Sequence, residues 1–211
     1  SADNTYHQIS WSGKGSLATQ LERMPIWCGQ ADNKLSGDSD NDMIQGAGGN
    51  DHVSGGSGRD ELWGDTGDDT LMGGVGRDTL LGNEGRDVLI GGKQADVLRG
   101  GLDQDILTGG KDSDRFVFES ITDSTVRAAD KIVDFKRGSD VIVLSAIDAN
   151  TTLDGNQRFH YIARKGFTAT AGELRLNGRG TVVGDVDGDG KADFAIRMEP
   201  FELLSKRDFS L

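Results

Sequence analysis

Aspartate recurs at every ninth residue over almost half of the chain, and a regular row of carboxylates of this kind can hold metal ions. Ten nine-residue units run from Cys28 to Val117, and their sixth position is Asp in nine units and Asn33 in the first. Carboxylate and carbonyl oxygens are hard ligands, the set that selects Ca²⁺. Neither His nor Cys recurs in the units, which disfavours zinc and copper. The pattern therefore predicts rows of calcium ligands.

Two further columns of the same units indicate the elements that position these carboxylates. The first position is Gly in nine of the ten units and the eighth is apolar in all ten. A Gly-rich stretch that ends in Asp favours a turn, and the three residues after it place one apolar side chain between two outward ones, as in a short strand. One such strand cannot bury its apolar residue alone, so we expect the units to stack as a solenoid.

The negative charge is concentrated in the units. The 211-residue sequence has a net charge of −12, and residues 28–117 carry 18 Asp and Glu against 8 Lys and Arg, leaving 17 against 15 elsewhere. Because a nucleic-acid binder needs a basic face to release counterions, nucleic acid is not an expected partner. No stretch reaches the about 18 consecutive apolar residues of a membrane helix, so no membrane span is predicted.

The unit resembles the nonapeptide G-G-x-G-x-D-x-U-x of the RTX (repeats-in-toxin) family of calcium-binding proteins. The resemblance implies an all-β fold, a right-handed parallel β-roll built as a nonapeptide solenoid, in which units two apart in the chain stack. Each calcium would lie between stacked turns. Its ligands would be two sixth-position Asp side chains and backbone carbonyls from positions two and four of one turn and one and three of the next.

Two rows of ligands follow from the resemblance, one on each edge of the roll, with about seven to nine Ca²⁺ ions. The first row contains Asn33, Asp51, Asp69, Asp87, Asp105 and, by the same spacing, Asp123. The second contains Asp42, Asp60, Asp78, Asp96 and Asp114, with Asp130 as its last member. Carbonyl ligands would come from Gly49, Gly55, Gly56, Gly58, Gly64, Gly67, Gly73, Gly74, Gly76, Gly82, Gly85, Gly91, Gly92, Gly100, Gly101 and Gly109. The fourth position departs from Gly at Ala31, Asp40, Gln94, Asp103 and Asp112, which weakens the predicted sites at the two ends.

After Val117 the period stops, and short strand-like runs predict a β-rich C-terminal part. The runs are 115–118, 132–135, 141–144, 159–162, 173–176, 181–183 and 193–198. The strings DKIVDF from Asp130 and GSDVIVLS from Gly138 resemble the C-terminal domain of serralysin-type proteases. Outward positions of the late units are apolar (Leu81, Val88, Ile90, Val97, Ile106 and Val117), so we expect the C-terminal part to pack over the last half of the roll and cap it.

Three segments are therefore expected. Residues 1–27 form an N-terminal lead or cap, or the tail of a preceding domain. Residues 28–126 form the RTX roll, and residues 127–211 the serralysin-type cap. The end of the chain, Asp208 to Leu211, resembles the uncleaved signal of type I secretion, and no N-terminal signal peptide is visible. This predicts an extracellular protein exported by type I machinery without a cleaved leader, and the single Cys28 is consistent with secretion without disulfides.

Enzyme signatures are missing from the sequence, which holds no H-E-x-x-H, G-x-S-x-G or Walker motif. We expect a non-catalytic module that is disordered without Ca²⁺ and folds cooperatively after export, as the folding and secretion module of an extracellular protein. One alternative is that the chain is the C-terminal part of a larger secreted enzyme such as a protease, lipase or glycanase.

Two further alternatives remain at this stage. The roll also resembles the R-modules of mannuronan epimerases, which implies binding of an anionic polysaccharide or a cell surface. A basic track for such a ligand would come from Arg59, Arg77, Arg86, Arg158, Arg164, Lys165, Arg175 and Arg179. Separately, the D-x-D-x-D-G loop of Asp185, Asp187, Asp189 and Asp193 matches the start of an EF-hand, but Ile196 stands where the bidentate Glu is needed, so it is an acidic turn or a further calcium site.

Overall fold

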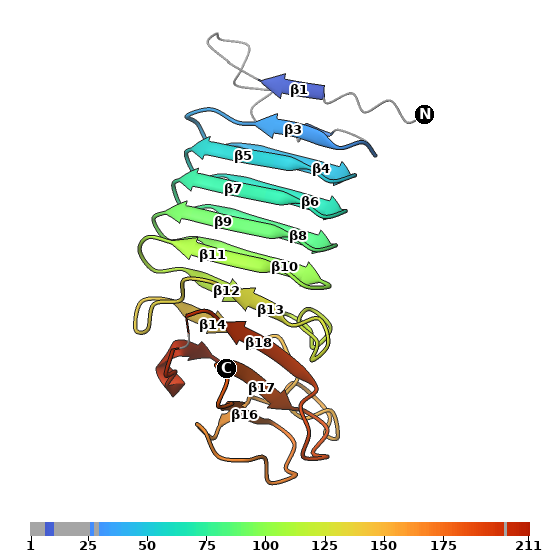
Figure 1. Cartoon of the computed structure of the whole chain (residues 1–211), viewed down its shortest axis with the longest axis vertical. Coiled ribbons are helices and arrows are strands. Elements are labelled where there is room, and N and C mark those ends of the chain that lie inside the picture. Colours follow the sequence, from blue (N-terminus) through green and yellow to red (C-terminus); the bar gives the residue numbers. More distant parts are fainter. Residues whose placement is uncertain (1–6, 11–25, 28–29, 201) are drawn as a thin grey trace.

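The protein is an all-β solenoid made mostly of parallel strands, seen here in a computed structural model (Figure 1). The structure describes residues 7–10, 26–27, 30–200 and 202–211. The chain alternates between two sheets as it coils, and each complete coil contains two nonapeptide units. The predicted fold class, a parallel β-roll with a β-rich C-terminal part, is confirmed.

Sheet A has eleven described strands and sheet B has eight. In spatial order, sheet A contains β1 (His7–Ser10), β3 (Asn33–Ser36), β5 (His52–Ser57), β7 (Thr70–Val75), β9 (Val88–Lys93), β11 (Ile106–Gly110), β13 (Asp130–Ile132), β18 (Phe194–Met198), β17 (Thr181–Asp185), β16 (Glu173–Leu176) and β15 (His160–Tyr161). Sheet B contains β19 (Phe209–Ser210), β14 (Val141–Val143), β12 (Arg115–Val117), β10 (Val97–Leu102), β8 (Thr79–Glu84), β6 (Glu61–Thr66), β4 (Met43–Gly48) and β2 (Ile26–Trp27). One 3-10 turn, η1 (Lys206–Asp208), precedes β19.

The register within the roll has a period of 18 residues, as two nine-residue units per coil require. Leu71 pairs with Leu89 in sheet A, and Leu80 pairs with Leu98 in sheet B. The eighth-position side chains point inward from both sheets and form one continuous core. They are at most 1% exposed: Leu35, Ile44, Val53, Leu62, Leu71, Leu80, Leu89, Leu98, Leu107 and Phe116.

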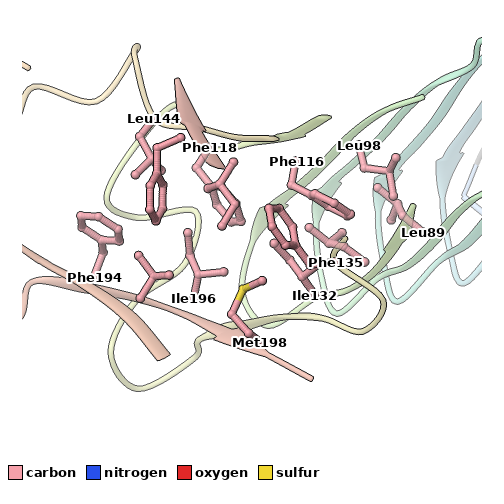
Figure 2. Close-up of a cluster of buried hydrophobic side chains, with 14 of the residues drawn as sticks. Leu89, Leu98, Phe116, Phe118, Ile132, Phe135, Leu144, Phe194, Ile196 and Met198 are labelled. Carbon is pink, nitrogen blue, oxygen red and sulfur yellow. The ribbon is translucent and has the colours of Figure 1, made fainter. Parts of the chain in front are cut away.

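The roll continues into the C-terminal part without a break in the sheets. Leu107 pairs with Ile132 and Phe116 with Ile142, so the coil grows to 25 and then 26 residues. The core becomes aromatic at this junction, where the Phe116 and Phe135 ring centroids lie 6.1 Å apart (Figure 2). Five of the predicted C-terminal strands lie within one residue of the observed ends, whereas β13 begins and ends earlier than the predicted run and β17 is longer.

The C-terminal part caps the end of the roll but does not cover its outer faces as predicted. Outward Val88 and Ile90 stay half-buried and Ile106 is 39% exposed. The prediction was wrong because β13 and β14 add to the ends of the two sheets. The last repeat strands, β11 and β12, thus find hydrogen-bond partners without a layer over the outer faces. Only the junction residue Val117 becomes buried.

The last residues of the chain are part of this cap. Strand β19 pairs with β14, and the Phe209 ring lies 5.1 Å from the Tyr161 ring. Asp208 is 2% exposed, and its carboxylate accepts hydrogen bonds from Gly138 N–H (3.1 Å) and Ser205 N–H (2.6 Å). The residues that resemble a secretion signal therefore also have a structural role.

At the other end, β1 pairs in parallel with β3, and β2 with β4, so both sheets continue into the predicted N-terminal segment. Cys28 and most of residues 1–27 lie outside the described residues. In the described part of the chain, no helix has the length and apolarity needed to cross a membrane.

Truncating one of the inward eighth-position side chains tests how much this core contributes to stability. We expect Leu89→Ala to lower the free energy of unfolding in saturating calcium by about 2–5 kcal/mol, because the site is enclosed and leaves a cavity. The adjacent Ile90→Ala, on the outer face, should cost less than half as much. Urea unfolding followed by circular dichroism measures both, and equal losses would contradict an inward column.

Candidate metal centre

The sixth-position side chains form two ladders, one along each edge of the roll. In each ladder, the backbone N–H of one Asp donates to Oδ1 of the Asp one coil later, as from Asp69 to Asp87 at 2.8 Å. On the first edge the bonds run Asn33–Asp51, Asp51–Asp69, Asp69–Asp87, Asp87–Asp105 and Asp105–Asp130. On the second edge they run Asp42–Asp60, Asp60–Asp78, Asp78–Asp96, Asp96–Asp114 and Asp114–Asp140.

The second carboxylate oxygen of nearly every ladder Asp is buried without a hydrogen-bond partner. These Oδ2 atoms belong to Asp51, Asp60, Asp69, Asp78, Asp87, Asp96, Asp105, Asp114 and Asp130. Their residues are at most 1% exposed. A buried carboxylate oxygen without a donor is strongly disfavoured unless a cation binds it. The ladders thus have the donor set and the missing charge that Ca²⁺ would supply.

Burial raises the pKa of the ladder carboxyls, because desolvation disfavours the charged form and neighbouring carboxylates repel it. The pKa rises to about 7 for Asp69 and Asp96, about 8 for Asp105 and about 9 for Asp130. Without cations, the folded chain would hold protons that the unfolded chain releases, so its stability would fall as the pH rises from the ordinary Asp pKa toward these values. Ionised ladders need bound positive charge.

The first-position glycines leave room beside these carboxylates. A Cβ on Gly82 would lie 2.1 Å from Asp87 Oδ2 and 2.4 Å from the carbonyl oxygen of Gly100, one coil later. Carboxylate and carbonyl oxygens therefore converge on the space that Gly82 leaves open. The same contacts recur at Gly64, Gly73 and Gly91. This convergence supports the predicted carbonyl ligands at position one.

The turns hold a left-handed backbone at the second and fourth positions. Gly58 and Gly76 have φ of 128° and 151°, and Cβ atoms there would lie within 2.1 Å of a carbonyl oxygen of the previous coil. In the last three units, residues other than Gly occupy the fourth position but keep this conformation. They are Gln94, Asp103 and Asp112, with φ of 72°, 74° and 78°. The C-terminal turns therefore retain the shape of the predicted sites. Ala31 and Asp40, among the described residues at the other end, lack the positive φ.

The structure corrects the ends of both predicted rows. Asp123 is not in a ladder, because its Oδ2 accepts the N–H groups of Glu119 (2.7 Å) and Ser120 (3.0 Å). Asp130 follows Asp105 on the first edge instead of ending the second. The reason is a seven-residue insertion in this coil, which moves the next ladder position from 123 to 130.

Sequence reasoning missed the last member of the second ladder. Asp140 is 2% exposed, and its Oδ1 accepts the N–H of Asp114 at 3.1 Å. Its Oδ2 accepts the N–H of Lys136 at 2.8 Å, so this end is satisfied by the chain itself. Asp140 could have been found from the motif G-x-D-x-I, because that Asp precedes an apolar strand just as each repeat Asp does.

A second, outer ladder runs along the fifth positions and was also missed. Asp68 N–H donates to Asn50 Oδ1 and Arg86 N–H to Asp68 Oδ1, both at 2.9 Å. Arg86 also forms an ion pair with Asp68. Arg59 and Arg77 stand on the opposite edge, so the three arginines do not line one basic track.

The loop between β17 and β18 gathers three carboxylates. Oxygens of Asp185, Asp187 and Asp193 lie within 4.8 Å of one another. Both oxygens of Asp185 already accept backbone N–H groups, from Gly188 (2.7 Å) and Gly190 (2.9 Å). The Asp185 oxygens thus have backbone donors, unlike the Oδ2 atoms of the ladders.

The ladder-bearing segment matches a known protein family. The family model described as Peptidase M10 serralysin C terminal matches residues 31–209. The chain belongs to the serralysin C-terminal family. No curated protein matches it. Among solved structures, it is similar to the solution structure of the AlgE6R3 subunit from the Azotobacter vinelandii mannuronan C5-epimerase, at 19% identity over 84% of this chain and 78% of that chain, with a TM-score of 0.30.

Filling the space beside one carboxylate of this serralysin C-terminal chain tests the site. We expect Gly82→Ala to weaken calcium-dependent folding, because its methyl group would occupy the position between Asp87 and Gly100. Gly178→Ala is the matched control, since no atom lies within 4 Å of its Cβ. Calcium titration by circular dichroism compares the midpoints, which should shift for Gly82→Ala alone. Equal midpoints in both variants would contradict the site.

Asp130 and Asp123 separate the corrected ladder from the predicted one. Asp130→Asn should lower the number of bound Ca²⁺ ions, because it removes a buried carboxylate whose Oδ2 has no hydrogen-bond partner. Asp123→Asn should leave the number of bound ions unchanged. Isothermal titration calorimetry counts the ions in each variant, and a loss of bound ions in Asp123→Asn would contradict the corrected ladder.

Proposed function

We propose that the chain is a calcium-binding module that folds as Ca²⁺ fills its two ladders. The observation that carries the proposal is the alignment of nine buried Oδ2 atoms without partners. The ligands would be these atoms together with turn carbonyls such as that of Gly100. Calcium, when bound, supplies the charge and the oxygen coordination that the carboxylates lack.

Without calcium, the small hydrophobic core of the roll does little to offset the conformational entropy and charge repulsion that oppose folding. The core contributes one side chain per unit, whereas ordering 21 glycines within residues 28–117 costs much conformational entropy. The stacked carboxylates repel one another as well. Seven independent sites, the lower end of the expected number, each at ten times its dissociation constant, would add on the order of 10 kcal/mol. Calcium binding would then decide whether the roll forms.

The proposed biological role is that of a non-catalytic folding and secretion module of an extracellular protein. The family to which the chain belongs is a C-terminal part of serralysin-type proteases, which supports this role. A chain that is disordered at low calcium and folds at the higher calcium concentration outside the cell suits passage through type I machinery. The ladder aspartates must stay ionised as ligands, so acid–base catalysis is not proposed for them.

A calcium titration followed by far-UV circular dichroism tests this function. The chelated chain should lack strand signal and gain it cooperatively at about 0.1–1 mM Ca²⁺, the range of extracellular calcium modules. Magnesium is the control, since its stricter octahedral geometry suits these carbonyl-rich turns poorly. A chain that is already folded in chelator, or that folds equally well with magnesium, would contradict calcium-driven folding.

A further inference from the structure

One pocket lies outside the ladders, in sheet B, where β12 is shorter than the neighbouring β10. It has a volume of about 450 Å³, and it is lined by β8, by β10 from Arg99 to Leu102, and by the segment that follows β12. Its volume is in the range of ligand sites. The function proposed above leaves this pocket unexplained.

The pocket exists because β12 stops short of its neighbour. Strand β10 pairs with β8 as far as Leu102, but with β12 only at Val97 and Leu98. In regular coils a third-position N–H donates to the previous coil, as Lys111 does to Gly92 O at 2.8 Å. The equivalent donor here, Ser120 N–H, bonds to Asp123 Oδ2 instead. The backbone hydrogen bond from Ser120 N–H to the Gly101 carbonyl is therefore not formed, and this part of the edge of β10 is left open.

The corresponding gap in sheet A is closed by the chain itself. Asp134 Oδ1 accepts Gly109 N–H at 2.9 Å, and its Oδ2 accepts Gly110 N–H at 2.7 Å. Lys136 Nζ donates to the Gly110 carbonyl. Side chains thus take the place of the missing strand on that edge, whereas no such filling is seen at β10 among the described residues.

The lining of the open gap favours a basic occupant. Glu84, Glu119 and Asp123 contribute three negative charges and Arg99 one positive charge, which pairs with Glu119 at 2.9 Å. Leu81, Leu102 and Val117 provide apolar surface between them. An open strand edge with acceptors and apolar contacts suits an added β-strand.

We propose that this pocket binds an extended peptide segment of a partner protein that carries Lys or Arg next to apolar residues. The segment would donate an N–H to the Gly101 carbonyl as an additional strand beside β10. Its basic side chain would lie near Glu84 and Asp123, and its apolar neighbours would contact Leu102. The proposal concerns the folded chain and does not depend on which ion folds it.

Fluorescence anisotropy with a labelled six-residue peptide of alternating valine and lysine tests the proposal. The full chain is used in saturating calcium, with folding verified by circular dichroism. We expect saturable binding, at least about tenfold weaker with Glu84→Lys. Glu61→Lys, on the same sheet but outside the pocket, is the matched control and should bind normally. Hydrogen exchange should slow at residues 100–102 when the peptide binds.

Several results would overturn the proposal. These are equal binding of a valine–glutamate peptide, equal loss of affinity in both charge reversals, and protection that lies away from residues 100–102. Binding of spermine as tight as that of the peptide would show charge attraction without strand pairing. Because circular dichroism reports folding separately, a failure here is distinct from a failure of calcium-driven folding.

Discussion

The burial of aspartate carboxylates in stacked turns is the constraint on which the rest of this structure depends. Nearly every ladder Asp uses one oxygen to hold the turn of the previous coil, as Asp87 does for Asp69, and leaves the other without a protein donor. The backbone bond fixes the spacing of the coils, and the remaining oxygen creates the need for a cation. Structure and ion binding therefore follow from the same side chain.

This constraint also explains the composition. The first-position Gly leaves space that a Cβ would fill, and left-handed φ values at the turns allow one coil to lie directly on the next. Only one residue per unit remains to form the core, such as Leu89, so the roll is long and thin. The larger aromatic core begins only where the repeats end, around Phe116 and Phe135 (Figure 2). That junction anchors one end of the roll.

The sequence predicted the repeated part well, because three columns with a fixed period determine turn, strand and core together. It failed where the period changed. A seven-residue insertion leaves no local signal of which ladder resumes, so Asp123 was placed in a row to which Asp130 belongs. Asp140 was missed because its coil is 26 residues long, which puts it outside the 18-residue spacing, although its motif G-x-D-x-I resembles the repeat. The outward apolar residues led to a wrong prediction as well. An apolar residue at an outward position, such as Ile106, indicates a covering layer in the sequence, but Ile106 is exposed in the structure.

The most direct test of the account is a crystal structure of the chain grown in calcium, with an anomalous difference map collected at long wavelength. The account predicts two rows of calcium peaks, each beside the Oδ2 atoms of the ladders from Asp51 to Asp130. Ladders without peaks, or peaks confined to the loop of Asp185, Asp187 and Asp193, would contradict it.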